Sequence, residues 1–218
     1  MKEVNSKNLF LFSLGMISGG ALFFLAHRSP WYGVMQSFFA GFLFWIVFGF
    51  FPERQQRNVV HDFLKKRYRS FRLNVVVLLL EAGSFNREVK AENLVSHNKF
   101  REFFSQRDSA NGCDYLERAT NGMRDCEAFI NDLKIEFDLF SEAVDFALNN
   151  LATRDLKALE ALSFLKRRLS DITRKSCYTG DQMKYIDNFI WEIMGMWSDV
   201  RGELPSDWIE DAIEGLRK

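Results

Sequence analysis

The chain has 218 residues, a formal net charge of zero, 23 phenylalanines and only 3 prolines. Its mean hydropathy of −0.17 excludes a polytopic transporter. Its three cysteines are widely spaced and form no Cys-x-x-Cys pair, which excludes a zinc knuckle or a disulfide framework. Scarce proline and few alternating apolar runs favour helices, so the sequence predicts an all-α fold.

Two uncharged apolar runs stand close together near the N-terminus. The first, residues 9–26, would extend about 27 Å as a helix, which is enough to cross a bilayer. The second covers residues 31–51 and follows after only four residues, so the two spans must be antiparallel. We therefore expect a two-helix transmembrane hairpin in residues 1–52 and a separate cytoplasmic helical bundle in residues 53–218.

A cleaved signal peptide is the alternative for the first run, with Lys2 and Lys7 as its basic end. The bulky sequence Phe-Phe-Leu at 23–25 is a poor cleavage region, and a second span follows at once. Both observations favour the hairpin.

Positive charges flank the two runs unevenly. Two lysines precede them, only Arg28 lies at the tip, and residues 53–72 hold seven Lys or Arg against two acids. Because cytoplasmic loops are enriched in Lys and Arg, we expect both termini in the cytoplasm, at a cell inner membrane. The cations of the basic segment are candidates to contact lipid headgroups: Arg54, Arg57, Lys65, Lys66, Arg67, Arg69 and Arg72.

Small residues recur in both runs at helical spacing. Such positions let helices approach closely in lipid. They indicate packing either within one hairpin or between several copies of it, and both alternatives stay open. The candidates for helix packing are Gly15, Gly19, Gly33, Ser37, Gly41 and Gly49.

Periodic apolar residues predict the helices that follow. One helix is expected from about Glu53 to Gly83, with 75–80 as its buried end rather than a strand. A second is expected over 87–107, before a turn at 108–112. The clearest stripe then has 3-4 spacing and predicts a third helix: Ile130, Leu133, Phe137, Phe140, Val144, Ala147 and Leu151.

Thr153 is the predicted N-cap of the next helix, whose apolar positions run from Leu156 to Ile172. These two helices form either an antiparallel pair within a bundle, which we favour, or an intermolecular coiled coil. A helix over 181–202 is rich in large apolar residues and is expected in the core, and a short helix follows Pro205. The segment 181–218 is acidic, with nine acids against four Lys or Arg.

No combination of residues indicates catalysis, a metal or a cofactor. His27, His61 and His97 are isolated, and metal-ligand, nucleophile and phosphate-loop motifs are missing from the sequence. The spacing of Arg54 and His61 matches the pair used by helical ribonucleases of the HEPN class, which makes a membrane-bound ribonuclease the third hypothesis. Because membrane topology already explains the cations, we expect no enzyme activity and no direct nucleic-acid site.

The organisation resembles the small two-transmembrane effectors of bacterial anti-phage systems, in particular those that accompany reverse transcriptases in retrons. The resemblance is one of architecture along the whole chain. It is carried by the link His-Arg-Ser-Pro at 27–30, the basic start Pro-Glu-Arg at 52–54, and the ends Phe-Ile-Trp-Glu at 189–192 and Asp-Trp-Ile-Glu at 207–210. It implies an inner-membrane protein that a partner complex holds inactive, and whose release damages the membrane and stops growth.

Two functions are therefore expected before the ribonuclease. The first is an anti-phage effector that acts by membrane disruption and abortive infection, with the lipid bilayer, copies of itself and a cytoplasmic protein or ribonucleoprotein as partners. The alternative is a membrane-anchored scaffold or interaction protein without toxic activity, whose acidic C-terminal segment binds a partner.

Overall fold

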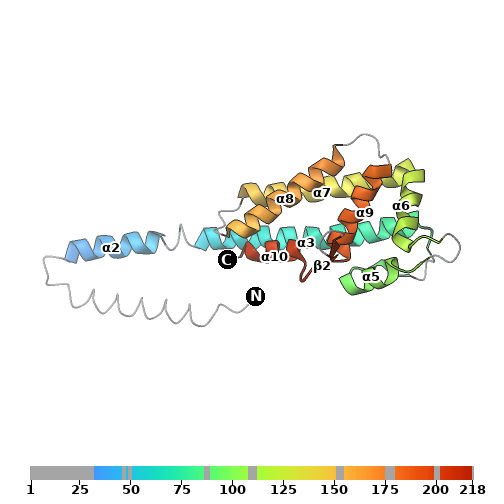
Figure 1. Cartoon of the computed structure of the whole chain (residues 1–218). Helices are drawn as coiled ribbons and strands as arrows, with labels where there is room; N and C mark the ends of the chain where they lie inside the picture. Colours follow the sequence, from blue (N-terminus) through green and yellow to red (C-terminus); the bar gives the residue numbers. More distant parts are fainter. Residues whose placement is uncertain are drawn as a thin grey trace. The chain divides into compact units, whose positions relative to one another are not determined.

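The computed structural model describes residues 32–45, 48, 51–85, 89–107, 112–150, 155–174, 180–198 and 202–217 (Figure 1). Its described elements are helices and one pair of two-residue strands, so the all-α prediction is confirmed. The chain divides into two compact units, residues 1–55 and 56–218. The first predicted span, 9–26, lies outside the described residues.

The first unit contains α2 (Tyr32–Trp45), which lies within the second apolar run. Four of its aromatic side chains, Phe38, Phe42, Phe44 and Trp45, are exposed, and Phe38 is 81% exposed. Phe44 contacts Phe48, with ring centroids 4.5 Å apart. Among the described residues, no helix combines the length and the apolar character needed to cross a bilayer.

The long helix α3 (Phe51–Ala82) agrees with the helix predicted from about Glu53. It begins one residue before Pro52, and proline is tolerated there because the first N–H groups of a helix have no intrahelical partner. The stretch 75–80 is helical and not a strand, as predicted. The helix ends at Ala82, and Ser84, two residues later, has a positive φ of 50°.

The single helix predicted over 87–107 is wrong. The chain forms two shorter helices, α4 (Ala91–Leu94) and α5 (His97–Phe104), with Ser96 in an extended conformation between them. Arg72 of α3 donates a hydrogen bond to the carbonyl of Val95 at this break. The arginine thus satisfies a helix-end carbonyl that would otherwise need the next helical N–H.

The sequence interpretation missed α6 (Tyr115–Asp125). Asp114 caps this helix by accepting a hydrogen bond from the backbone N–H of Glu117, at 2.7 Å. An acidic N-cap followed three residues later by Glu is a known start signal. This signal could have revealed the helix.

The next two helices, α7 (Glu127–Asn150) and α8 (Leu156–Thr173), confirm the two predicted stripes. They pack against each other within the bundle, which is the alternative that we favoured. Asp155 caps α8 by accepting two backbone N–H groups, whereas the predicted cap Thr153 lies outside the described residues. Leu151 lies outside them too, but most of the predicted α7 stripe is buried: Leu133, Phe137, Phe140, Val144 and Ala147.

The helix predicted over 181–202 is too long. α9 (Gly180–Met194) ends early, and a small antiparallel hairpin follows, formed by β1 (Trp197–Ser198) and β2 (Gly202–Glu203). Met196 has a φ of 53° and Gly202 a φ of 72°, which right-handed helices do not allow. The last helix, α10 (Trp208–Gly215), follows Pro205 as expected.

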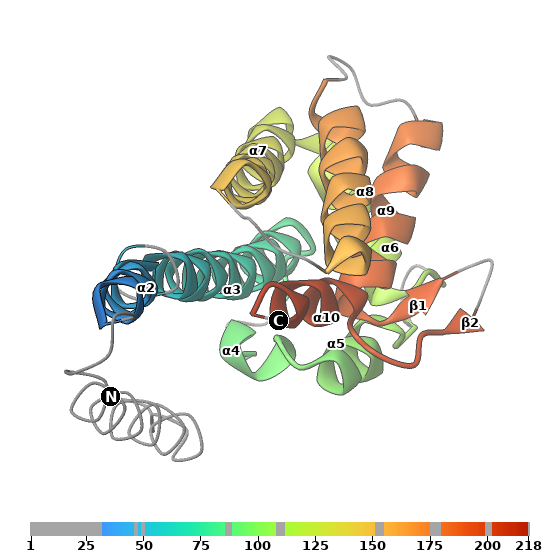
Figure 2. The same cartoon turned by 90° about the vertical axis from the view of Figure 1, so that its left-hand side faces the viewer.

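The core of the second unit is built around aromatic side chains of α3 and α7. The ring of Phe71 stacks on that of Phe140, with centroids 4.6 Å apart, and Phe137 contacts Phe189 of α9. These rings are fully buried, and burying one such side chain contributes roughly 1.5–3 kcal/mol. Figure 2 shows α8 and α9 side by side, with α10 near the start of α8.

Candidate functional site: the ionic junction of the C-terminal helix

The basic segment and the acidic C-terminal segment meet within the second unit, at what we call the ionic junction. Asp207 is its centre, because it precedes α10 and faces α3. One carboxylate oxygen accepts the backbone N–H groups of Ile209 and Glu210 at 3.0 and 3.1 Å, which is the geometry of an N-cap. The other oxygen faces side chains from two other helices.

Three side chains share that second oxygen. The hydroxyl of Tyr68 donates to it at 2.8 Å, Nε2 of His97 lies 3.1 Å away, and a guanidinium nitrogen of Arg72 lies 3.5 Å away. The side chains of Arg72 and Asp207 are only 9% and 8% exposed. This is a buried charge pair, and Tyr68, His97 and the carbonyl of Val95 supply further hydrogen bonds to it, whereas Nε of Arg72 is buried without a partner among the described residues.

The electrostatics of this cluster favour a charged carboxylate. Burial alone would raise the pKa of Asp207, but hydrogen bonds from His97 and Tyr68 outweigh burial and lower that pKa below its usual value. Burial raises the pKa of Tyr68 well above the usual value, and the neighbouring Asp207 charge adds to the effect. The phenol therefore remains a hydrogen-bond donor at every physiological pH.

A more exposed set of ion pairs continues the junction along α10. Lys65 pairs with Glu214, and its ammonium lies 3.8 Å from Glu210. Arg217 contacts Asp62 at 2.6 Å. The hydrogen bond from Lys65 lowers the pKa of Glu214. Exposed pairs of this kind contribute little stability, about 0–1 kcal/mol each, so the buried part holds α10 more firmly.

His61 lies beneath these pairs and is fully buried. Its Nδ1 is 2.9 Å from a carboxylate oxygen of Asp62, and its Nε2 is 3.4 Å from one of Glu214. The exposed Arg54 shares no such environment with it. The ribonuclease hypothesis needs both side chains at one accessible site, and the buried position of His61 gives it no support.

The chemistry of the junction is that of a structural contact. The ring nitrogens of His97 face the carbonyl of Met194, at 2.8 Å, and the carboxylate of Asp207. With both nitrogens engaged, this ring has no free position for a substrate. Within the described ranges, no group of three His, Cys, Asp or Glu side chains is placed to hold a metal ion.

The seven cations predicted to contact headgroups lie in different environments. Arg54, Lys66 and Arg69 are exposed, and Arg57 is partly buried. Lys65 belongs to the junction, and Arg67 pairs with Glu136 at 3.2 Å. Arg72 is buried beside Asp207, so headgroup contact is excluded for this residue in the fold described here. The prediction stays open for the other six cations, of which Arg54, Lys65, Lys66 and Arg69 are exposed.

The predicted packing residues of the membrane runs are described in part. Gly15, Gly19 and Gly49 lie outside the described residues. The hydroxyl of Ser37 donates to the carbonyl of Gly33 at 3.0 Å. A Cβ atom added at Gly33 or Gly41 would meet no atom of the described chain within 4 Å, so these positions are open to a neighbouring helix.

Sequence reasoning missed the central residues of the junction. Asp207, His97 and Tyr68 come from three separate segments, and no motif links them. The only signal was the opposite charge of the segments 53–72 and 181–218. Comparison with protein-family models, curated proteins and solved structures found no match, so a functional conclusion rests on the residues and their geometry alone.

Proposed function

We propose that this protein is a bacterial inner-membrane effector of an anti-phage defence system, which disrupts the membrane when its helical domain is released from a partner complex. In this proposal residues 1–52 form the membrane hairpin, with both termini in the cytoplasm. Residues 53–218 form the domain that a cytoplasmic protein or ribonucleoprotein restrains.

The observation that carries the proposal is the exposed aromatic surface of α2. Phe38, Phe42, Phe44 and Trp45 are between 51% and 81% exposed within one short helix. Large apolar patches on soluble proteins mark contacts with lipid or protein. The open surface at Gly33 and Gly41 supports close approach of another helix in lipid.

The contacts of the second unit support a regulatory domain, which a partner restrains, rather than a catalytic one. Its charged groups are used to fix α10 against α3, and the described residues contain no metal-binding group. An effector of this kind needs a domain that holds a defined structure and presents a surface to its partner. The bundle provides both.

The test is membrane potential, followed with a voltage-sensitive dye in bacteria that express the full chain alone. We expect depolarisation and growth arrest. The matched control carries Leu at positions 15, 19, 41 and 49, and it should reach the same level in alkaline-washed membranes without depolarising them. Equal depolarisation by both chains, or none by the native chain at high membrane levels, would reject membrane disruption.

A membrane-anchored scaffold is the second candidate, and one observation favours it. The second unit has exposed apolar side chains on adjacent helices, such as Phe63 and Leu139, and apolar side chains grouped in this way mark a contact surface. A scaffold would keep its activity when residues 1–52 are replaced by an unrelated two-span anchor. An effector would lose it.

A further inference from the structure

Two adjacent helices of the second unit expose a continuous set of apolar side chains, which we call the α3/α7 face. Each of these side chains is between 42% and 60% exposed. On α3 they lie four residues apart, and on α7 at intervals of four and seven, so each helix carries one stripe. The residues are Val59 and Phe63 of α3, and Ile135, Leu139 and Phe146 of α7.

The two stripes lie side by side because α3 and α7 are antiparallel neighbours. Gln56 donates to the carbonyl of Asn150, the ring of Phe63 lies 5.3 Å from that of Phe146, and Asn74 donates to Glu136. Along α3 the residue numbers of these contacts rise while those along α7 fall. The order of these contacts shows which residues of α3 and α7 lie at the same position along the helix direction, which we call equal height.

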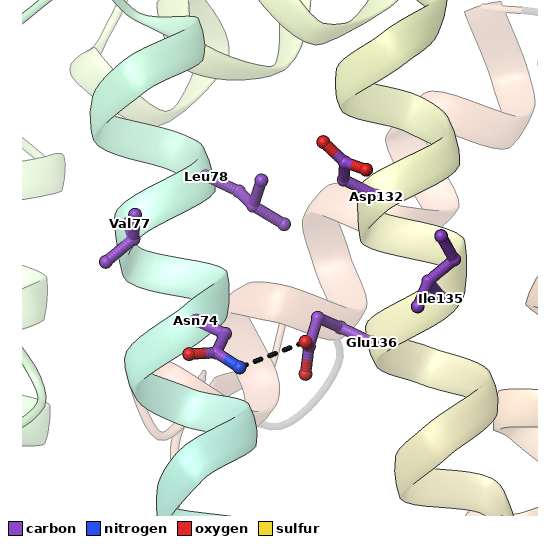
Figure 3. Close-up of a pocket in the computed structure, with 6 residues that line it drawn as sticks. All are labelled: Asn74, Val77, Leu78, Asp132, Ile135 and Glu136. Carbon is purple, nitrogen blue, oxygen red and sulfur yellow. Dashed lines mark hydrogen bonds between the residues drawn. The ribbon is translucent and has the colours of Figure 1, made fainter.

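A shallow groove continues the face at its far end. It has a volume of about 270 Å³ and is lined by Asn74, Val77, Leu78, Asp132, Ile135 and Glu136. Figure 3 shows side chains of α3 and α7 lining it from both sides, with the bond from Asn74 to Glu136 closing one end. Val77 and Ile135 therefore lie at similar height on the two helices.

The charges beside the stripes have opposite sign on the two helices. Lys66 of α3 and Glu142 of α7 are exposed, and neither has an ion-pair partner among the described residues. Lys66 lies three residues after Phe63, and Glu142 lies four residues before Phe146. Since Phe63 and Phe146 touch, Lys66 and Glu142 are at the same height, on opposite edges of the face.

We propose that the α3/α7 face binds a second copy of this chain. The two copies are related by a two-fold axis that runs parallel to α3 and α7 and lies in front of the face, midway between the two helices. This rotation sets α3 of each copy against α7 of the other without changing height. Lys66 then lies opposite Glu142 of the partner copy, and Val77 lies opposite Ile135 of the partner copy. Each interface contains both pairs twice.

The mixture of charges favours a second copy over other occupants. Anionic headgroups would be repelled by the exposed carboxylates of α7, which are those of Asp132 in the groove and of Asp138 and Glu142. A uniformly basic partner would meet Lys66, and a uniformly acidic one would meet the same three carboxylates. The face is complementary to itself, which a homodimer requires. The inference rests on the proposed membrane anchoring in one respect, because anchoring brings copies of the chain together in one membrane.

Disulfide trapping between two tagged full-length chains tests the geometry. One chain carries Val77→Cys and the other Ile135→Cys, in a background with Cys113, Cys126 and Cys177 changed to Ser. Mild oxidation in membranes should give the mixed dimer. The control pair is Lys99→Cys with Glu160→Cys, two positions that are also exposed but lie on α5 and α8, away from the face. Mixed dimer at no more than the control level would overturn the proposal.

Charge reversal in the same cysteine pair tests the chemistry. Lys66→Glu or Glu142→Lys in both chains should lower trapping about tenfold, because each dimer then contains two repulsive pairs. The double reversal should restore it, whereas Lys99→Glu should have no effect. Failure of the double variant to recover would count against the Lys66–Glu142 contact. Release of the chain from membranes by alkaline wash would reject the anchoring separately, since trapping can still be measured in solution.

Discussion

The Nε2 atom of His97 lies 3.1 Å from the carboxylate of Asp207, and this contact joins positions 110 residues apart in the sequence. His97 begins α5, and Asp207 caps α10. The other ring nitrogen of His97 contacts the carbonyl of Met194 at the end of α9. One small cluster thus fixes the ends of three helices against the middle of α3.

Two substitutions of Asp207 should distinguish the stability contributed by its charge from that contributed by its helix cap. Asp207→Ala removes both and leaves Arg72 buried without its anion, which costs about 3–5 kcal/mol. Asp207→Asn keeps a good N-cap and should lose less. We expect thermal unfolding, followed by tryptophan fluorescence in detergent, to begin roughly 10 °C lower for the Ala variant. Equal melting of the Ala variant and the native chain would show that the buried pair does not hold the fold.

Lys65→Ala on α3 provides the matched comparison, because its partner Glu214 lies on α10, the helix that Asp207 caps. Its pair with Glu214 is exposed, with side chains 48% and 43% accessible, and water screens the interaction. We expect a change below about 1 kcal/mol in the free energy of unfolding. A loss as large as that of Asp207→Ala would show that the exposed part of the junction matters as much as the buried part.

The junction should weaken in acid. The pKa values of Asp62, Asp207 and Glu214 are all lowered in the folded chain. Burial opposes this for all three, most strongly for Asp207, but hydrogen bonds to the charged carboxylates outweigh it. A lowered pKa means that these groups stabilise the fold above the usual carboxyl pKa, and that this contribution is lost as pH falls through the folded pKa. We expect the melting temperature to fall below about pH 4. The Asp207→Asn variant should show a smaller decrease.

Asp187 should change stability with pH in the opposite direction, because its contribution is lost as pH rises toward neutrality. Burial raises its pKa to about 7, the negative charges of Asp114 and Glu117 add to this effect, and a hydrogen bond from Thr120 opposes it. The folded chain therefore holds a proton that the unfolded chain has already lost, so stability falls between about pH 4 and pH 7 and then levels off.

Asp187→Asn removes this titration while keeping an oxygen for Thr120, which lies 3.3 Å away. We expect the variant to be more stable than the native chain at pH 8, by roughly 1–2 kcal/mol, and to lose that advantage at pH 5. Melting temperatures of both chains across this range provide the measurement. An advantage that does not change with pH would contradict a protonated Asp187.

Local patterns in the sequence predicted helices, and long-range contacts decided where they end. The stripes of α7 and α8 were readable because their buried residues repeat every three or four positions. The break before α5 could not be read from a local pattern, because it depends on Arg72, which lies 23 residues before Val95. The charges of segments 53–72 and 181–218 were visible, but only the fold pairs Asp207 with Arg72 and Glu214 with Lys65.

Gly122 marks a close approach that no sequence pattern indicated. A Cβ atom added there would lie 2.1 Å from the carbonyl oxygen of Ala82, at the end of α3. Because that oxygen belongs to the backbone, α6 would have to move away from α3. Gly122→Ala should therefore destabilise the bundle by about 1–3 kcal/mol, although alanine favours helices intrinsically.

The control is Asn121→Ala, one position earlier on α6, where the side chain is partly exposed. It gains helix propensity without meeting Ala82 and should leave the melting temperature unchanged or slightly higher. Opposite shifts for the two variants, measured by tryptophan fluorescence, would establish that α6 packs on the end of α3 through Gly122. If Gly122→Ala melted at or above the temperature of Asn121→Ala, the two helices would have to be farther apart than described, because a Cβ at position 122 would otherwise lie 2.1 Å from the Ala82 carbonyl oxygen.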